Sequence, residues 1–170
     1  MSKSHDEEFT SFAASALPQL RRTAFLVCGD WHRAEDAAQE ALIRTYRSWR
    51  RVERREGLLA YARRTAVRVL VDESRRPWRR ERTSGHADLD HAVADPATAY
   101  VEQDAVLVAL SSLTPRRRAC VVLRYYHDLS VAETARALGC SEGTVKSQTS
   151  DALKALRPLV SEVVEHGSSR

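Results

Sequence analysis

Residues 130–156 read SVAETARALGCSEGTVKSQTSDALKAL and contain the clearest structural signals in the C-terminal half of the chain. Ser130 is followed three residues later by Glu133, and this spacing is a capping box that predicts the start of a helix. Gly139 can take the left-handed conformation that ends this helix, and Ser141 can cap a second helix. The stretch therefore predicts two helices joined by a tight turn, which is a helix-turn-helix.

The second helix, predicted over 142–156, has two chemically different faces. The apolar face is expected to lie on the core and comprises Val145, Thr149, Ala152, Leu153 and Leu156. The opposite face is small and polar and comprises Gly143, Thr144, Ser147, Gln148 and Asp151. Such side chains suit insertion into the major groove of DNA, where hydroxyls and amides contact base edges and a helix N-terminus can approach phosphate. An ordinary helical hairpin is the alternative interpretation.

The composition indicates a helical protein made of small units. The chain has 170 residues with only 6 Gly and 5 Pro, and Ala, Arg, Leu and Val dominate. We expect an all-α fold with two small helical domains. No apolar run approaches the roughly 20 residues that span a bilayer, and the N-terminus MSKSHDEEF lacks the apolar core of a signal peptide. We therefore expect a cytoplasmic protein without membrane insertion.

The cysteines predict packed, reduced thiols. Cys28, Cys120 and Cys140 are odd in number, widely spaced and free of any CxxC pair. A zinc site that combines them with His86 or His91 is a less favoured alternative. We expect no metal and no other cofactor.

The net charge of +4 conceals a strong segregation of charge along the chain. Residues 44–82 hold 14 Arg against five acids, whereas residues 83–104 hold five acids and no Lys or Arg. Basic blocks of this density indicate a polyanionic partner, with a solvated arginine face as the alternative. The acidic stretch contains Gly85 and Pro96 without sustained periodicity, so it is predicted to be a linker.

Three helices are predicted in the N-terminal half. Residues 1–5 are expected to be disordered, and an apolar stripe then predicts a helix over 9–28 that is kinked or interrupted at Pro18. The next two helices are predicted over 31–51 and 57–76.

The helix over 31–51, which Asp30 can cap, carries an acidic face. This face comprises Asp36, Gln39, Glu40 and Ile43. Asp36 and Glu40 repel each other slightly at a spacing of four, so they serve something outside the helix. Complementation of the helix dipole accounts for Glu35 and Asp36 but explains Glu40 and Ile43 poorly. A catalytic carboxylate pair is disfavoured because no nucleophile, metal-ligand pair or glycine loop accompanies it.

The helix over 57–76 presents guanidinium groups in a row, which suits phosphates. The arginines are Arg64, Arg68 and Arg75, with Arg63, Arg76, Arg79 and Arg80 close by. Tyr61 and Trp78 can stack on exposed bases, although a core position is the preferred interpretation for Tyr61.

Two further helices are predicted before the helix-turn-helix. The first runs over 100–113. The second begins with Thr114 as its cap and Pro115 in its first turn, and it runs to about His127. Their predicted core residues are Val106, Leu110, Leu113, Val121, Val122 and Tyr125. Pro158 is expected to end the last helix.

Two separated motifs resemble those of the extracytoplasmic-function sigma factors of bacterial RNA polymerase, of the sigma-E type. The segment AEDAAQEAL at 34–42 resembles the AEDxxQExF segment of region two. In that family this segment binds the clamp helices of the largest catalytic subunit. The resemblance implies that Glu35, Asp36, Gln39, Glu40 and Ile43 dock on the polymerase.

The same resemblance implies two DNA contacts. The stretch from 61 to 76 resembles the segment that opens and reads the −10 element, which implies roles for Tyr61, Arg63, Arg64, Arg68, Asp72, Arg75 and Arg76. LTPR at 113–116, together with the helix-turn-helix, resembles region four, which reads the −35 element. The implied −35 contacts are Arg116, Ser141, Gly143, Thr144, Lys146, Ser147, Gln148 and Asp151.

The resemblance implies a non-enzymatic sigma factor with region two over 6–80, an acidic linker over 81–99 that threads toward the polymerase cleft, and region four over 100–160. Its partners would be core RNA polymerase, including the flap of the second-largest subunit, and promoter DNA. An anti-sigma factor is left open.

The chain departs from the family pattern at three positions. Arg68 stands where relatives often have Asn, and Gln148 and Asp151 stand where relatives commonly have basic residues. We expect a changed −35 preference or weaker phosphate anchoring.

Two other functions stay open at this point. GTVKS also occurs in LuxR-type regulators, in which residues 1–80 would sense a signal or dimerise. A small enzyme that uses Glu35, Asp36 and Glu40 is the third class.

Overall fold

The computed structural model describes residues 2–49, 51, 56–76 and 102–167, and every regular element within these ranges is a helix. The predicted all-α class is confirmed. The chain divides into two compact units, Met1–Arg79 (unit 1) and Arg80–Arg170 (unit 2). The predicted linker over 81–99, with His86 and His91, and the side chains of Trp78, Arg79 and Arg80 lie outside the described residues. None of the described helices is long and apolar enough to cross a membrane.

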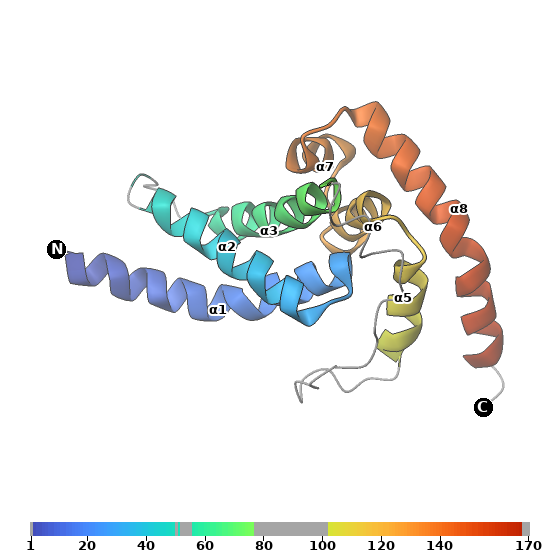
Figure 1. The fold of residues 1–170 in the computed structure, drawn as a ribbon, viewed down its shortest axis with the longest axis horizontal. Coiled ribbons are helices and arrows are strands. Elements are labelled where there is room, and N and C mark those ends of the chain that lie inside the picture. The colour runs from blue at the N-terminus through green and yellow to red at the C-terminus, as the bar shows by residue number, and fades with distance from the viewer. Residues whose placement is uncertain (1, 50, 52–55, 77–101, 168–170) are drawn as a thin grey trace. The chain divides into compact units, whose positions relative to one another are not determined.

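Unit 1 consists of α1 (Ser2–Cys28), α2 (Trp31–Trp49) and α3 (Leu58–Ser74), and each helix packs on the other two (Figure 1). Gly29 makes the turn between α1 and α2 with a φ of 70°, where a side chain would be strained. Asp30 caps α2 as predicted, because its Oδ1 accepts a hydrogen bond of 3.0 Å from the backbone N–H of Arg33.

Helix α1 differs from its prediction at two places. It begins at Ser2, so the disorder expected up to residue 5 is wrong for residues 2–5. The early turns are held by long-range contacts, since the Asp6 carboxylate accepts a hydrogen bond of 3.0 Å from the Tyr46 hydroxyl. The helix also continues through Pro18. The Pro18 ring is exposed, and the buried side chains of Ala16 and Leu20 on either side pack without interruption.

Small side chains form the centre of unit 1. Ala16, Leu20, Ala38 and Ala62 are buried together, with Phe12, Leu17, Leu42 and Leu59 packed around them. Alanine on three facing helices lets their backbones approach closely, so an enlarged side chain would not fit. One end of the unit is closed by an aromatic cluster in which Phe9 lies 4.8 Å from Tyr46 and 5.2 Å from Trp49 between ring centroids.

Unit 2 consists of α5 (Glu102–Ser111), α6 (Pro115–Val121), the π-helix η2 (Val122–Tyr126), α7 (Val131–Leu138) and α8 (Glu142–Gly167). Helices α5, α6 and α7 all pack against α8. Thr114 is the N-cap residue of α6 as predicted, although its side chain makes no capping hydrogen bond.

The π-helix replaces the last turn of the helix predicted to reach His127. The backbone N–H of His127 donates to the carbonyl of Val122 at 3.1 Å, five residues back. The Arg124 side chain stabilises the turn that follows by donating a hydrogen bond of 2.7 Å to the Leu129 carbonyl. This geometry turns Tyr125 outward, and it is 57% exposed, so its predicted core position is wrong.

The core of unit 2 contains some, but not all, of the other side chains that were predicted to be buried there. Leu110, Leu113 and Val122 are buried as predicted. Val106 is 55% exposed although helical periodicity puts it on the same side of α5 as the buried Leu110, one turn further along, so its predicted core position is wrong. Leu153 is also exposed, at 38%, whereas Val145 and Ala152 are fully buried.

The helix-turn-helix is confirmed in detail. The backbone N–H of Ser130 donates to the Glu133 carboxylate at 2.8 Å, and the backbone N–H of Glu133 donates to the Ser130 hydroxyl at 3.1 Å. Gly139 ends α7 with a φ of 63°. Ser141 caps α8, since its hydroxyl accepts a hydrogen bond of 3.1 Å from the backbone N–H of Thr144.

Helix α8 is longer than predicted. It passes through Pro158, which is exposed, and ends at Gly167. The expected helix end at Pro158 is therefore wrong. The exposed ring meets no packed neighbour, and the helix continues on both sides although Pro158 has no backbone N–H to donate.

Candidate docking face and nucleic-acid interface

The acidic face of α2, defined as Asp36, Gln39, Glu40 and Ile43, forms a single stripe. At about 100° per residue these positions fall within one side of the helix. Asp36 and Gln39 are exposed, Glu40 is half-buried, and the Ile43 side chain is 48% exposed. An apolar side chain in the middle of carboxylates is a feature of surfaces that bind another protein.

Glu35 lies off this stripe and is bound to α1. The Arg21 Nε lies 2.5 Å from its Oε2, and Gln39 donates to its other oxygen at 3.2 Å. Arg21 lies 5.7 Å from the ring centroid of Trp31, and Trp31 stacks on Phe25 at 4.0 Å. The structure thus ties Glu35 into the α1–α2 packing. Of the acidic face, Glu40 forms an ion pair of 2.6 Å with Arg44 one turn along.

A basic face on α3 gathers five of the predicted −10 residues. These are Tyr61, Arg64, Arg68, Asp72 and Arg75, all exposed and all on one side of the helix. Tyr61 is 36% exposed, so its preferred assignment to the core is wrong. The ion pair between Arg68 and Asp72 is long, at 3.9 Å between Nε and Oδ2, and both side chains are more than half exposed. Exposed pairs of this kind contribute little, so both groups are accessible to a ligand.

Arg63 and Arg76 lie apart from the other −10 candidates. Arg63 points toward α1, where its Nη2 donates to the Gln19 amide oxygen at 2.7 Å. Arg76 follows the end of α3 and is exposed. A further contact that sequence reasoning missed joins α2 to α3, with Arg33 Nη2 lying 3.6 Å from Glu73 Oε2.

One side of α8 brings together four of the predicted −35 residues, of which Ser147 is exposed and the other three are half-buried. We call this side the reading face: Thr144, Ser147, Gln148 and Asp151. The hydroxyls of Ser141 and Thr144 lie 2.9 Å apart, and the Ser147 hydroxyl donates to the Thr144 carbonyl at 3.1 Å. These hydroxyls therefore bond to one another and to the backbone within the first turns of α8. Gly143 is exposed beside it.

Two predicted −35 residues lie off the reading face. Lys146 is exposed about 160° around the helix from Thr144, as helical periodicity requires. Arg116 is half-buried in α6, and its Nε is buried without a hydrogen-bond partner.

Asp151 carries an ion pair that reaches across unit 2. Its Oδ2 lies 2.9 Å from Nη2 of Arg117 on α6. Sequence reasoning missed Arg117 because the two residues are 34 positions apart and no local pattern links them.

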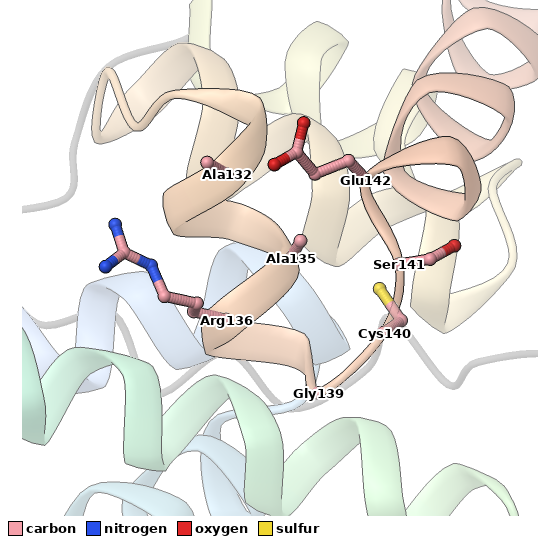
Figure 2. A pocket seen from close by; sticks show the side chains of 7 residues that line it. All are labelled: Ala132, Ala135, Arg136, Gly139, Cys140, Ser141 and Glu142. Atoms are coloured by element: carbon pink, nitrogen blue, oxygen red, sulfur yellow. The ribbon is translucent and has the colours of Figure 1, made fainter.

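A hollow opens between α7 and the turn into α8 (Figure 2). It is lined by Ala132, Ala135, Arg136, Gly139, Cys140, Ser141 and Glu142. Its small side chains and its position make it the crevice between the two helices of the helix-turn-helix.

Of the three thiols that were expected to be packed, that of Cys120 is buried, whereas Cys28 and Cys140 are half-buried. Cys120 is buried, and burial is the main cause that raises its pKa to about 11, with the nearby Cys140 adding to the shift. Among the described side chains, no group of three or more His, Cys, Asp or Glu residues is placed to hold a metal ion. Because His86 and His91 lie outside the described residues, the zinc alternative is untested.

Two family models match the chain, one within each half. Residues 12–80 match Sigma-70 region 2, and residues 103–156 match Sigma-70, region 4.

Full-length relatives agree with this match. The chain is 34% identical over 154 residues to the RNA polymerase sigma-E factor of Streptomyces coelicolor, covering 88% of this chain and 84% of the relative. It is 32% identical over 151 residues to the ECF RNA polymerase sigma factor SigL of Mycobacterium tuberculosis, covering 85% and 84%. The fold also resembles the sigma factor RpoE of Bartonella quintana, solved in complex with the anti-sigma factor NepR, with a TM-score of 0.66 at 24% identity over 91% of this chain and 98% of that one.

The chain belongs to the sigma-70 family, in its extracytoplasmic-function group. It is a sigma factor that directs transcription and is not an enzyme. Its partners are core RNA polymerase and promoter DNA. None of these matches favours the LuxR-type alternative.

Proposed function

We propose that this sigma factor divides its work between three segments. Residues 6–80 dock on the polymerase and hold the −10 element, residues 81–99 form the acidic linker toward the polymerase cleft, and residues 100–160 bind the −35 element and the flap of the second-largest subunit. The protein acts in the cytoplasm, where its polymerase is.

The acidic face of α2 docks on the clamp helices of the largest subunit. The observation that carries this assignment is the exposure of Ile43 among Asp36, Gln39 and Glu40 on one stripe. Apolar contact at the centre of an interface contributes affinity, and surrounding carboxylates select a basic partner. Glu35 then acts by fixing α2 against α1 through Arg21.

The basic face of α3 and the reading face of α8 contact the two promoter elements. Arg64, Arg68 and Arg75 bind phosphates of the −10 element, with Arg76 beside them and Tyr61 available to stack on an unpaired base. On α8, Thr144, Ser147 and Gln148 contact base edges in the −35 major groove, and Ser141 and Gly143 lie at the helix N-terminus that approaches phosphate. Lys146 binds the backbone rather than a base edge.

We infer an anti-sigma factor as a regulator, since the structurally similar RpoE was solved bound to one. Its binding would cover the acidic face or the exposed apolar residues of unit 2. Competition with core polymerase would reveal it.

A pull-down with core RNA polymerase tests the docking assignment. Reversal of Asp36 and Glu40 to Lys is expected to abolish capture, because it turns two carboxylates of the acidic face into ammonium groups. Ile43→Ala is expected to weaken capture about tenfold or more, as a central apolar contact does. The matched control is Glu7→Lys with Glu8→Lys, two exposed acids at the start of α1.

Capture by the control variant at the wild-type level, together with loss in the acidic-face variant, supports the assignment. Undiminished capture of the Asp36→Lys, Glu40→Lys variant would overturn it. Circular dichroism of each variant shows that the helices are retained.

A further inference from the structure

The ion pair between α6 and α8 has a consequence for DNA binding. We propose that Asp151 sequesters Arg117, so that this guanidinium is withheld from the phosphates that flank the −35 element. The proposal rests on the proposed function of α8 as the −35 helix, and it assigns Asp151 a role other than base contact.

The ion pair between Arg117 and Asp151 lies at the surface of unit 2. Arg117 Nη2 and Asp151 Oδ2 lie 2.9 Å apart, a charge-assisted hydrogen bond. The side chain of Arg117 is 36% exposed and that of Asp151 is 42% exposed. A DNA phosphate can therefore approach both groups, and it competes with the carboxylate for the guanidinium.

The position of Asp151 places this competition at the edge of the groove. Asp151 shares the reading face with Thr144 and Gln148 and lies two helical turns, about 10.5 Å, beyond Thr144. With the start of α8 in the major groove, side chains at this depth approach the phosphates that border it. A carboxylate there repels phosphate. Its ion pair with Arg117 neutralises this repulsion, but the Arg117 guanidinium is then no longer available to bind a phosphate.

Stability does not account for the pair. Half-exposed ion pairs contribute little to folding. Helices α6 and α8 pack on each other, and both carry fully buried side chains, such as Ala119 and Cys120 on α6 and Val145 on α8. The fold therefore persists when the pair is broken, and the effect of breaking it appears in DNA binding.

Substitution Asp151→Asn tests the proposal, because it keeps the size of the side chain and removes its charge. Reconstituted holoenzyme is titrated onto a fluorescent promoter duplex between about 50 and 200 mM salt. We expect the variant to bind about two- to fivefold more tightly at low salt, since Arg117 is released to a phosphate. The plot of log K against log salt should become steeper by about 0.9, the value of one additional phosphate contact.

Two further variants separate sequestration from general charge effects. Arg117→Gln combined with Asp151→Asn should return the salt slope to the wild-type value, because no cation is left to release. Asp128→Asn removes a carboxylate from the same unit and suits the φ of 53° at this position, so it should leave the slope unchanged. Melting curves of all variants confirm that unit 2 is folded.

Three results would overturn the proposal. An unchanged salt slope in Asp151→Asn means that Arg117 is not withheld from phosphate. A loss of affinity confined to one base pair means that Asp151 contacts a base. If the wild-type holoenzyme binds equally well to a promoter with a scrambled −35 box, α8 does not have its proposed function. This outcome is distinguishable because it is measured on the wild-type protein alone.

Discussion

The helices within each of the two units of this sigma factor are fixed by a different kind of contact. In unit 2 the ends of α7 and α8 are fixed by side chains three residues away, in the Ser130–Glu133 capping box and the Ser141 cap. In unit 1 Asp30 caps α2 in the same local way, but the helices are also joined by long-range hydrogen bonds. Tyr46 bonds to Asp6 across 40 residues, Arg63 bonds to Gln19 across 44 residues, and α3 begins at Gly57 without a side-chain cap.

The two units are therefore expected to be sensitive to different substitutions. A helix with local caps begins and ends at the same residue even when a distant contact is lost. A three-helix unit built on alanine depends on close packing between helices, so it is sensitive to any cavity. Substitutions in the core should therefore affect unit 1 strongly, whereas changes in the caps should affect unit 2 by smaller, local amounts.

The largest effect is expected from Leu20→Ala. Leu20 is fully buried between α1, α2 and α3, so its truncation should lower the free energy of unfolding of unit 1 by about 2–5 kcal/mol. Calorimetry of the full chain measures the loss. The control is Leu153→Ala, which removes a side chain that is 38% exposed and should change stability by about 0.5 kcal/mol or less. Equal effects of the two substitutions would contradict the packing argument.

Gly139→Ala should rank second. Its φ of 63° is in the left-handed region, where a Cβ atom costs about 1–2 kcal/mol, and unit 2 should melt at a correspondingly lower temperature. If α7 ended without this conformation, the substitution would be neutral, and the local account of unit 2 would be wrong.

Ser130→Ala removes the capping box and should destabilise unit 2 by about 1 kcal/mol. Chemical denaturation followed by circular dichroism measures it. Thr114→Ala is the matched control, because Thr114 occupies the N-cap of α6 without a side-chain hydrogen bond and should lose much less. A larger loss at Thr114 would reverse the expected ranking.

The smallest change, and the only stabilising one among these four, is expected from Gly143→Ala. A Cβ atom there would meet only the Ser141 hydroxyl at 3.8 Å, so the helix gains alanine's propensity and about 0.5–1 kcal/mol of stability. A thermal melt tests this gain. A destabilised variant would show that Gly143 is required by the fold of α8 rather than by whatever approaches its exposed surface.

Local signals in the sequence predicted unit 2 well where the chemistry lies within a few residues. The capping box, the left-handed Gly139 and the Ser141 cap were all predicted and are all present. The stripe on α2 was predicted from helical periodicity, and the structure brings Asp36, Gln39, Glu40 and Ile43 to one exposed side.

Features that depend on tertiary contact were not predictable. No periodicity distinguishes an exposed proline inside a long helix from one that ends it, so α1 and α8 were predicted too short or interrupted at Pro18 and Pro158. The partners of Glu35 and Asp151 lie on other helices, and their pairing with Arg21 and Arg117 depends on how the helices pack.

The direction in which two surface tyrosines point depends on the number of residues in the π-helix η2. A π turn contains one more residue per hydrogen-bonded ring than an α turn, so every side chain after it is rotated relative to those before it. Leu123 is buried, while Tyr125 and Tyr126 point to solvent. Removing a single residue from 122–126 would restore α-helical spacing and rotate these rings to a different side, so an insertion or deletion here would alter this part of the surface more than most point substitutions.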